Sequence, residues 1–139
     1  MNEIGLNKAR AERLEQKNII TSRLSETTRF VAFGVAAWVV TIHSSDKEFA
    51  NGLIDNFEIW INFAGACALL AIALDYFHYL AAYASVRHAL NRPQSEYKYD
   101  SNHPGYVLQY VFFFLKQATV AAAATIITMT FVIYVVINQ

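Results

Sequence analysis

The sequence is poor in the residues that form cross-links and catalytic loops. Cys67 is its only cysteine, so no disulfide can form within the chain, and a small packing residue is its expected role. The five glycines form no phosphate-binding loop, and the chain lacks a paired-cysteine zinc pattern, a His-Glu-x-x-His motif and a serine nucleophile elbow. We therefore expect neither an enzyme nor a bound metal or cofactor.

An early apolar stretch is also missing. The first 28 residues are polar and charged, so no cleavable secretory signal is expected. Charge of one sign is not in excess either, because 11 basic residues balance 11 acidic ones. Only the distribution of these charges along the chain can therefore indicate an orientation or a partner.

Apolar residues, by contrast, are abundant. The chain is 55% hydrophobic and 14% aromatic, a composition that suits lipid better than water. Residues 118–137 contain no charge, proline or glycine, and a helix of this length crosses the roughly 30 Å hydrocarbon core of a bilayer. The sequence therefore predicts a membrane protein.

Two further apolar runs are candidates for spans. Residues 30–42 are a short run, which reaches about residues 28–45 when Arg29 and the polar flanks extend to the interface. The other covers about residues 57–77, with aromatic residues near both ends, as in an interfacial belt. Its helical pattern continues to Leu90, before Pro93, so this helix should project beyond the membrane.

The connection between the first two runs has local order of its own. Ser45 and Glu48 form a capping-box pattern, and Asn51 followed by Gly52 is a helix-stop signal. These signals predict a short surface helix, followed by a new helix that begins at Phe57.

The third helix has a clear start signal. Asn102 or His103 before Pro104 is typical of a helix N-terminus. We place Lys116 at the membrane interface, so residues 118–137 cross the bilayer and the preceding residues form a membrane-proximal extension.

Basic residues set the predicted orientation. Six lie among residues 1–29 and others flank the loop near residue 92, whereas the connection near residue 50 has only Lys47. We expect an all-α membrane protein with three transmembrane helices and long cytosolic helical extensions. Residues 1–29 form a cytosolic basic helix and residues 30–139 a three-span domain with a cytosolic hairpin at about residues 78–117. The N-terminus is cytosolic and the C-terminus outside.

Asp75 and His78 lie one helical turn apart. An acid and a histidine at membrane depth can form half a metal site or a proton relay. The neighbouring tyrosines favour the other interpretation, an interfacial polar pair that water solvates.

Small and weakly polar residues follow one face of the last span. Thr119, Thr125 and Thr128 lie among alanines there, and Asn62 adds an amide to the second span. Such a stripe either packs one helix against another or lines an aqueous path in a ring of subunits. Three spans do not enclose a pore alone, so conduction requires a symmetric homo-oligomer.

The layout of the chain resembles that of small membrane effectors of bacterial anti-phage systems. The shared features are a polar first helix, a cytosolic helical extension and stretches of small residues in the spans, here 34–37 and 121–124. The resemblance implies a pore in the bacterial inner membrane, controlled by a nucleotide or oligonucleotide that a cytosolic enzyme makes. Phosphate recognition needs clustered positive charge. The residues expected to contact such a signal are Arg10, Arg13, Lys17, Arg87, Arg92 and Lys98.

The alternative is a structural or accessory subunit of a larger membrane complex that conducts nothing. It predicts an aromatic surface buried against a partner, consisting of Tyr106, Tyr110, Phe112, Phe113 and Phe114.

Overall fold

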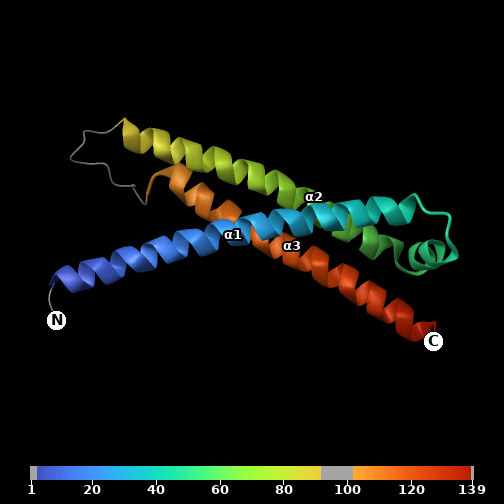
Figure 1. The fold of residues 1–139 in the computed structure, drawn as a ribbon. Coiled ribbons are helices and arrows are strands. Elements are labelled where there is room, and N and C mark those ends of the chain that lie inside the picture. Colours follow the sequence, from blue (N-terminus) through green and yellow to red (C-terminus); the bar gives the residue numbers. More distant parts are fainter. Residues whose placement is uncertain (1–2, 92–101, 139) are drawn as a thin grey trace.

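The chain folds into long helices that run alternately up, down and up. A computed structural model describes residues 3–91 and 102–138, with side chains described from residue 12 onward in the first of these ranges. Within these ranges the elements are α1 (Glu3–His43), α2 (Glu48–Leu90) and α3 (Pro104–Ile137), and no strand occurs. The C-terminal ends of α1 and α3 lie at one end of the bundle (Figure 1). The prediction of an all-helical fold is confirmed.

Helix α3 begins where the sequence predicts. His103 is its N-cap, Pro104 follows in the first turn, and the His103 Nδ1 accepts a hydrogen bond from the backbone N–H of Gly105 at 3.2 Å. A Cβ at residue 105 would lie 2.9 Å from the Ser85 Oγ and 3.2 Å from the Ala81 carbonyl oxygen. Glycine therefore lets the start of α3 lie directly against α2.

The start of α2 differs from the prediction. Its N-cap is Lys47 rather than Ser45, whose hydroxyl only accepts a long 3.4 Å bond from the Lys47 N–H. The predicted stop at Gly52 is also wrong, since the helix continues through it. The reason is tertiary packing, because Leu53 is completely buried in a cluster beneath this turn.

The break instead falls at the predicted start of the second span. Phe57 has non-helical backbone angles (φ −137°, ψ 19°), and the first segment of α2 turns away from the rest of the helix there (Figure 1). Beyond this kink α2 continues without interruption to Leu90, its predicted end.

Small side chains fill the contact between the helices. Ala64 and Ala68 of α2 and Ala123 of α3 are completely buried, and the largely buried Val35 of α1 belongs to the same cluster. A Cβ on Gly65 would lie 3.2 Å from the Val39 Cγ1 of α1, so glycine sets the approach of α1 to α2 at this point. Close contact between small residues is the usual way in which helices associate where lipid surrounds them.

Two helices, α2 and α3, are long and apolar enough to cross a membrane. Many of the large apolar side chains of the described residues are exposed on the outside of the bundle, an arrangement that suits a lipid environment. The apolar part of α1 is limited to residues 30–42, and its crossing of the membrane stays a prediction.

The N-terminal half of α1 leaves the bundle. Every described side chain from residue 12 to residue 20 is exposed, and this part of the helix diverges from α2 and α3 (Figure 1). The predicted cytosolic helix and the first apolar run are therefore one continuous helix. We call residues 12–24 the α1 arm.

Candidate functional site

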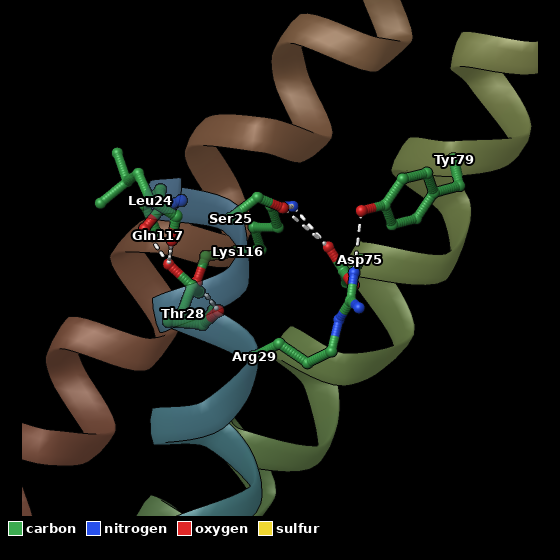
Figure 2. Close-up of polar contacts among 9 residues, drawn as sticks. Leu24, Ser25, Thr28, Arg29, Asp75, Tyr79, Lys116 and Gln117 are labelled. Atoms are coloured by element: carbon green, nitrogen blue, oxygen red, sulfur yellow. Dashed lines mark hydrogen bonds and ion pairs between the residues drawn. The ribbon is translucent and has the colours of Figure 1, made fainter. Parts of the chain in front are cut away.

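Each helix brings one charged side chain to the same level of the bundle. Arg29 of α1, Asp75 of α2 and Lys116 of α3 meet where the α1 arm joins the apolar part of the bundle (Figure 2). Each of these residues stands at the edge of an apolar run. Because the helices alternate in direction, the three edges coincide, and we call the group, with Ser25 and Tyr79, the ionic cluster.

Lys116 is the most deeply buried member of the ionic cluster. Its side chain is completely inaccessible, and its Nζ lies 2.5 Å from the Asp75 Oδ1. The same ammonium donates a hydrogen bond to the Ser25 Oγ at 2.6 Å. Ser25 in turn donates to the Asp75 carboxylate at 3.4 Å. The ammonium therefore has partners on both α1 and α2.

Arg29 occupies the other oxygen of the carboxylate. Its Nε donates to the Asp75 Oδ2 at 2.8 Å, and its Nη2 donates to the Tyr79 hydroxyl at 2.8 Å. The guanidinium carbon also lies 5.4 Å from the centre of the Tyr79 ring, within reach of a cation–π contact. Unlike Lys116, the Arg29 side chain is 40% exposed, so water screens this ion pair.

The charges of the ionic cluster do not cancel. One carboxylate faces two cations, which leaves a formal charge of +1 among these three side chains. A buried ion pair costs desolvation energy, and removing one partner typically costs about 3–5 kcal/mol because the other charge is left uncompensated. The cluster thus fixes how the three helices meet, and changing one member affects the other two.

A second polar contact lies beside the ionic cluster. The Thr28 hydroxyl of α1 lies 2.5 Å from the Gln117 Oε1 of α3 and 2.7 Å from the Leu24 carbonyl oxygen (Figure 2). Its single proton serves one acceptor at a time. The Gln117 Nε2 is buried without a hydrogen-bond partner among the described residues.

The predicted pair of Asp75 and His78 is arranged differently from the expectation. The Asp75 side chain is only 11% exposed, so the expectation that water solvates its carboxylate is wrong, and the partners of the carboxylate come from α1 and α3. His78 packs against Tyr79 and Phe113, and its Nδ1 is buried with no hydrogen-bond partner in the described part of the chain. No group of three metal-ligating side chains occurs among the residues that the structure describes.

The predicted pore-lining residues lie mostly on the outer surface of the chain. Thr125, Thr128 and Asn62 are exposed, and Thr119 is partly buried. The Thr128 hydroxyl donates to the Ala124 carbonyl oxygen at 2.8 Å, within its own helix. None of the four belongs to the ionic cluster.

Of the basic residues predicted to contact an anionic signal, those with described side chains lie at the end of the bundle from which the α1 arm departs. Arg13 and Lys17 are exposed on the arm, one helical turn apart, and Arg87 is exposed near the end of α2. Arg10 lies in α1, but its side chain is outside the described residues, as are Arg92 and Lys98 in the connection between α2 and α3.

The sequence does contain a pattern that predicts the ionic cluster, but this pattern involves all three helices and not the spacing of two residues along one helix. Each apolar run has a charged residue at one edge, and the charges are of opposite sign in neighbouring helices. An alternating topology places these edges together, so topology combined with charge predicts the pairing of Asp75 with Arg29 and Lys116. No comparable pattern identifies the contact of Thr28 with Gln117.

Comparison of the chain with protein-family models, with curated proteins and with solved structures gives no match. The function is therefore inferred from the geometry and charges of the chain itself.

Proposed function

We propose that this chain is the subunit of a homo-oligomeric membrane channel that opens when α1 changes its position relative to α2 and α3. The observation that carries the proposal is the ion pair of Lys116 with Asp75, which is buried between helices and shared with Arg29 on α1. Charged residues at membrane depth are costly and are mostly kept for function.

The ionic cluster is suited to hold one of two helix arrangements. Apolar side chains alone could join these helices, as they do around Ala64 and Ala123. Polar contacts also hold α1 in a defined position, but other charges or water can replace these contacts when α1 moves. In this proposal the described arrangement is the closed state, and separation of Arg29 and Ser25 from Asp75 accompanies opening.

The conducting path lies between copies of the chain. The centre of the single bundle is filled by completely buried residues such as Ala68 and Ile61, which leaves no room for ions there. Thr125, Thr128 and Asn62, in contrast, lie on the outside of the chain, where a ring of copies would bring them around a common axis.

Control comes from the cytosol. With three spans in the bacterial inner membrane and the N-terminus inside, the α1 arm extends into the cytosol and the C-terminus lies outside. The layout shared with anti-phage membrane effectors suggests a nucleotide or oligonucleotide signal. Arg13 and Arg87 would contact its phosphates, together with Arg10, Arg92 and Lys98.

The test combines the mass of the solubilised protein with ion flux in liposomes. We expect a defined oligomer, and flux that Thr125→Leu or Thr128→Leu reduces at least tenfold. Thr41→Leu is the matched control, since Thr41 is also exposed and its hydroxyl also bonds within its own helix. A monomer that conducts nothing, with or without candidate nucleotides and with or without residues 1–24, would contradict the proposal.

An exposed aromatic face supports a second candidate, a non-conducting scaffold subunit. On α3, Tyr110 is 63% exposed, Phe114 52% and Tyr106 40%. Large exposed aromatic residues are typical of protein interfaces. This candidate predicts that the isolated chain is a silent monomer, and that Tyr110→Ala or Phe114→Ala weakens its capture by a membrane partner without changing its own unfolding.

A further inference from the structure

A groove lies beside the ionic cluster, between the α1 arm and the α2–α3 pair. Its volume is about 530 Å³, in the range of pockets that hold small molecules. Thr21 of α1, His78 of α2 and Phe113 of α3 line it, and each lies one helical turn from a member of the ionic cluster. The groove therefore begins where the cluster ends and follows the diverging α1 arm.

The two sides of the groove differ in chemistry. Helix α1 contributes the basic Lys17 and the polar Asn18, whereas α3 contributes the aromatic Tyr110 and Phe113. The aromatic side continues onto the outer surface, because Phe114 also lines the groove and is 52% exposed. A cationic side facing an aromatic side that reaches the outer apolar surface matches a molecule with an anionic head and an apolar tail.

The charge of the groove favours a single phosphodiester. Lys17 is the one cation among its described lining residues, and the exposed Arg13 lies one turn further along the α1 arm. A nucleotide with two or three phosphates would leave most of its charge unmatched by this lining. One lipid phosphate carries about one negative charge and pairs with Lys17 alone.

The position of the groove is also that of a lipid headgroup. The groove lies next to the edges of the apolar runs, on the side of the bundle that carries most of the basic residues that the structure describes. If this side is cytosolic, the groove is at the level of the inner leaflet, where anionic lipids attract basic residues.

We propose that this groove binds one anionic phospholipid per chain, with its phosphate at Lys17 and an acyl chain along Tyr110 and Phe113. The bound lipid fills the space between the α1 arm and α3 and so supports the described position of α1. Binding itself does not depend on conduction, so a protein that conducts nothing can still bind the lipid. Only the effect of the lipid on opening rests on the proposed function.

The test is native mass spectrometry of the full chain, purified in detergent and incubated with phosphatidylglycerol or with phosphatidylcholine of the same chain length. We expect one phosphatidylglycerol per chain, retained in preference to phosphatidylcholine. Lys17→Gln should lower this preference about fivefold, the effect of one lysine near an anionic lipid. Arg23→Gln is the matched control, because Arg23 is exposed on the same arm and does not line the groove.

A second variant tests the groove itself. Ala82→Trp places a large ring into the lining and should reduce retention of phosphatidylglycerol at least fivefold, whereas Ala84→Trp, on an exposed position of the same helix, should not. Equal retention of the two lipids, or equal effects of Lys17→Gln and Arg23→Gln, would overturn the proposal. Lys17-dependent binding of ATP with no binding of phosphatidylglycerol would show that the groove takes a nucleotide and would equally overturn it.

Discussion

Replacing Asp75 with asparagine removes the negative charge that Lys116 and Arg29 share. The side chain keeps its size, and its amide oxygen can still accept a hydrogen bond from Ser25. Lys116, however, is completely buried, so its ammonium is left without a compensating charge. The expected loss of unfolding free energy is about 3–5 kcal/mol. The pair with the exposed Arg29 adds about 0–1 kcal/mol, because water screens it.

The matched variants separate the charge effect from a packing effect. Lys116→Met removes the buried cation, and Asp75 keeps Arg29 and Ser25 as partners, so we expect a loss of at most about 1.5 kcal/mol. The double variant Asp75→Asn/Lys116→Met has no uncompensated buried charge. It should therefore be more stable than Asp75→Asn alone by about 2 kcal/mol or more.

The assay is SDS titration of the protein in detergent micelles, followed by the fluorescence of Trp38 and Trp60. A double-mutant cycle gives the coupling energy between the two positions directly. If the losses of the single variants add within about 0.5 kcal/mol, the two side chains are not coupled, and the interpretation of the buried ion pair is refuted.

Two further predictions concern the contacts of α1. Thr28→Val removes the hydrogen bond to Gln117 and should lower the unfolding free energy by about 1–3 kcal/mol in the same SDS titration. Adding Gln117→Leu should recover most of the lost free energy, because no buried amide is then left unpaired. An equal loss in the single and the double variant would contradict the contact. Gly65→Leu should overpack the contact of α1 with α2, because even a Cβ on residue 65 would lie 3.2 Å from the Val39 side chain. We expect a loss of unfolding free energy of about 1–3 kcal/mol and a lower Tm. Gly34→Leu is the control, because a Cβ on residue 34 has no atom within 4 Å, and it should leave the Tm equal or higher. Equal decreases in Tm for the two variants would contradict the packing of α1 on α2.

The helices themselves could be predicted from the sequence because their signals are local. Apolar residues at helical spacing locate the second and third helices, and the ends at Leu90 and Pro104 follow from the neighbouring prolines and the His103 cap. The all-helical fold required no knowledge of how distant residues meet.

The start of α2 and the ionic cluster depend on tertiary contacts, which local sequence patterns do not specify. Gly52 is a good stop signal in isolation, but Leu53 is buried beneath the same turn and the helix continues. Helical spacing pairs Asp75 with His78, because the two lie on one helix. Its actual partners, Arg29 and Lys116, lie 46 and 41 residues away along the chain, beyond the reach of any helical spacing.

The most direct test of the proposed gating locks α1 to α2 with a disulfide. The Val39 Cβ lies 3.6 Å from the position of a Cβ on Gly65, within the range of about 3.5–4.5 Å that disulfides require. Val39→Cys and Gly65→Cys, with Cys67→Ala to remove the native thiol, are combined with Asp75→Asn, which releases the ionic cluster. Formation of the disulfide also reports that α1 still packs on α2.

Ion flux is then measured in liposomes with the disulfide oxidised and after reduction. The proposal predicts that the oxidised protein conducts little and that reduction raises the flux at least tenfold, because α1 can then leave α2. Equal flux from the oxidised and the reduced protein, with the disulfide fully formed in the first, would contradict a channel that opens by movement of α1.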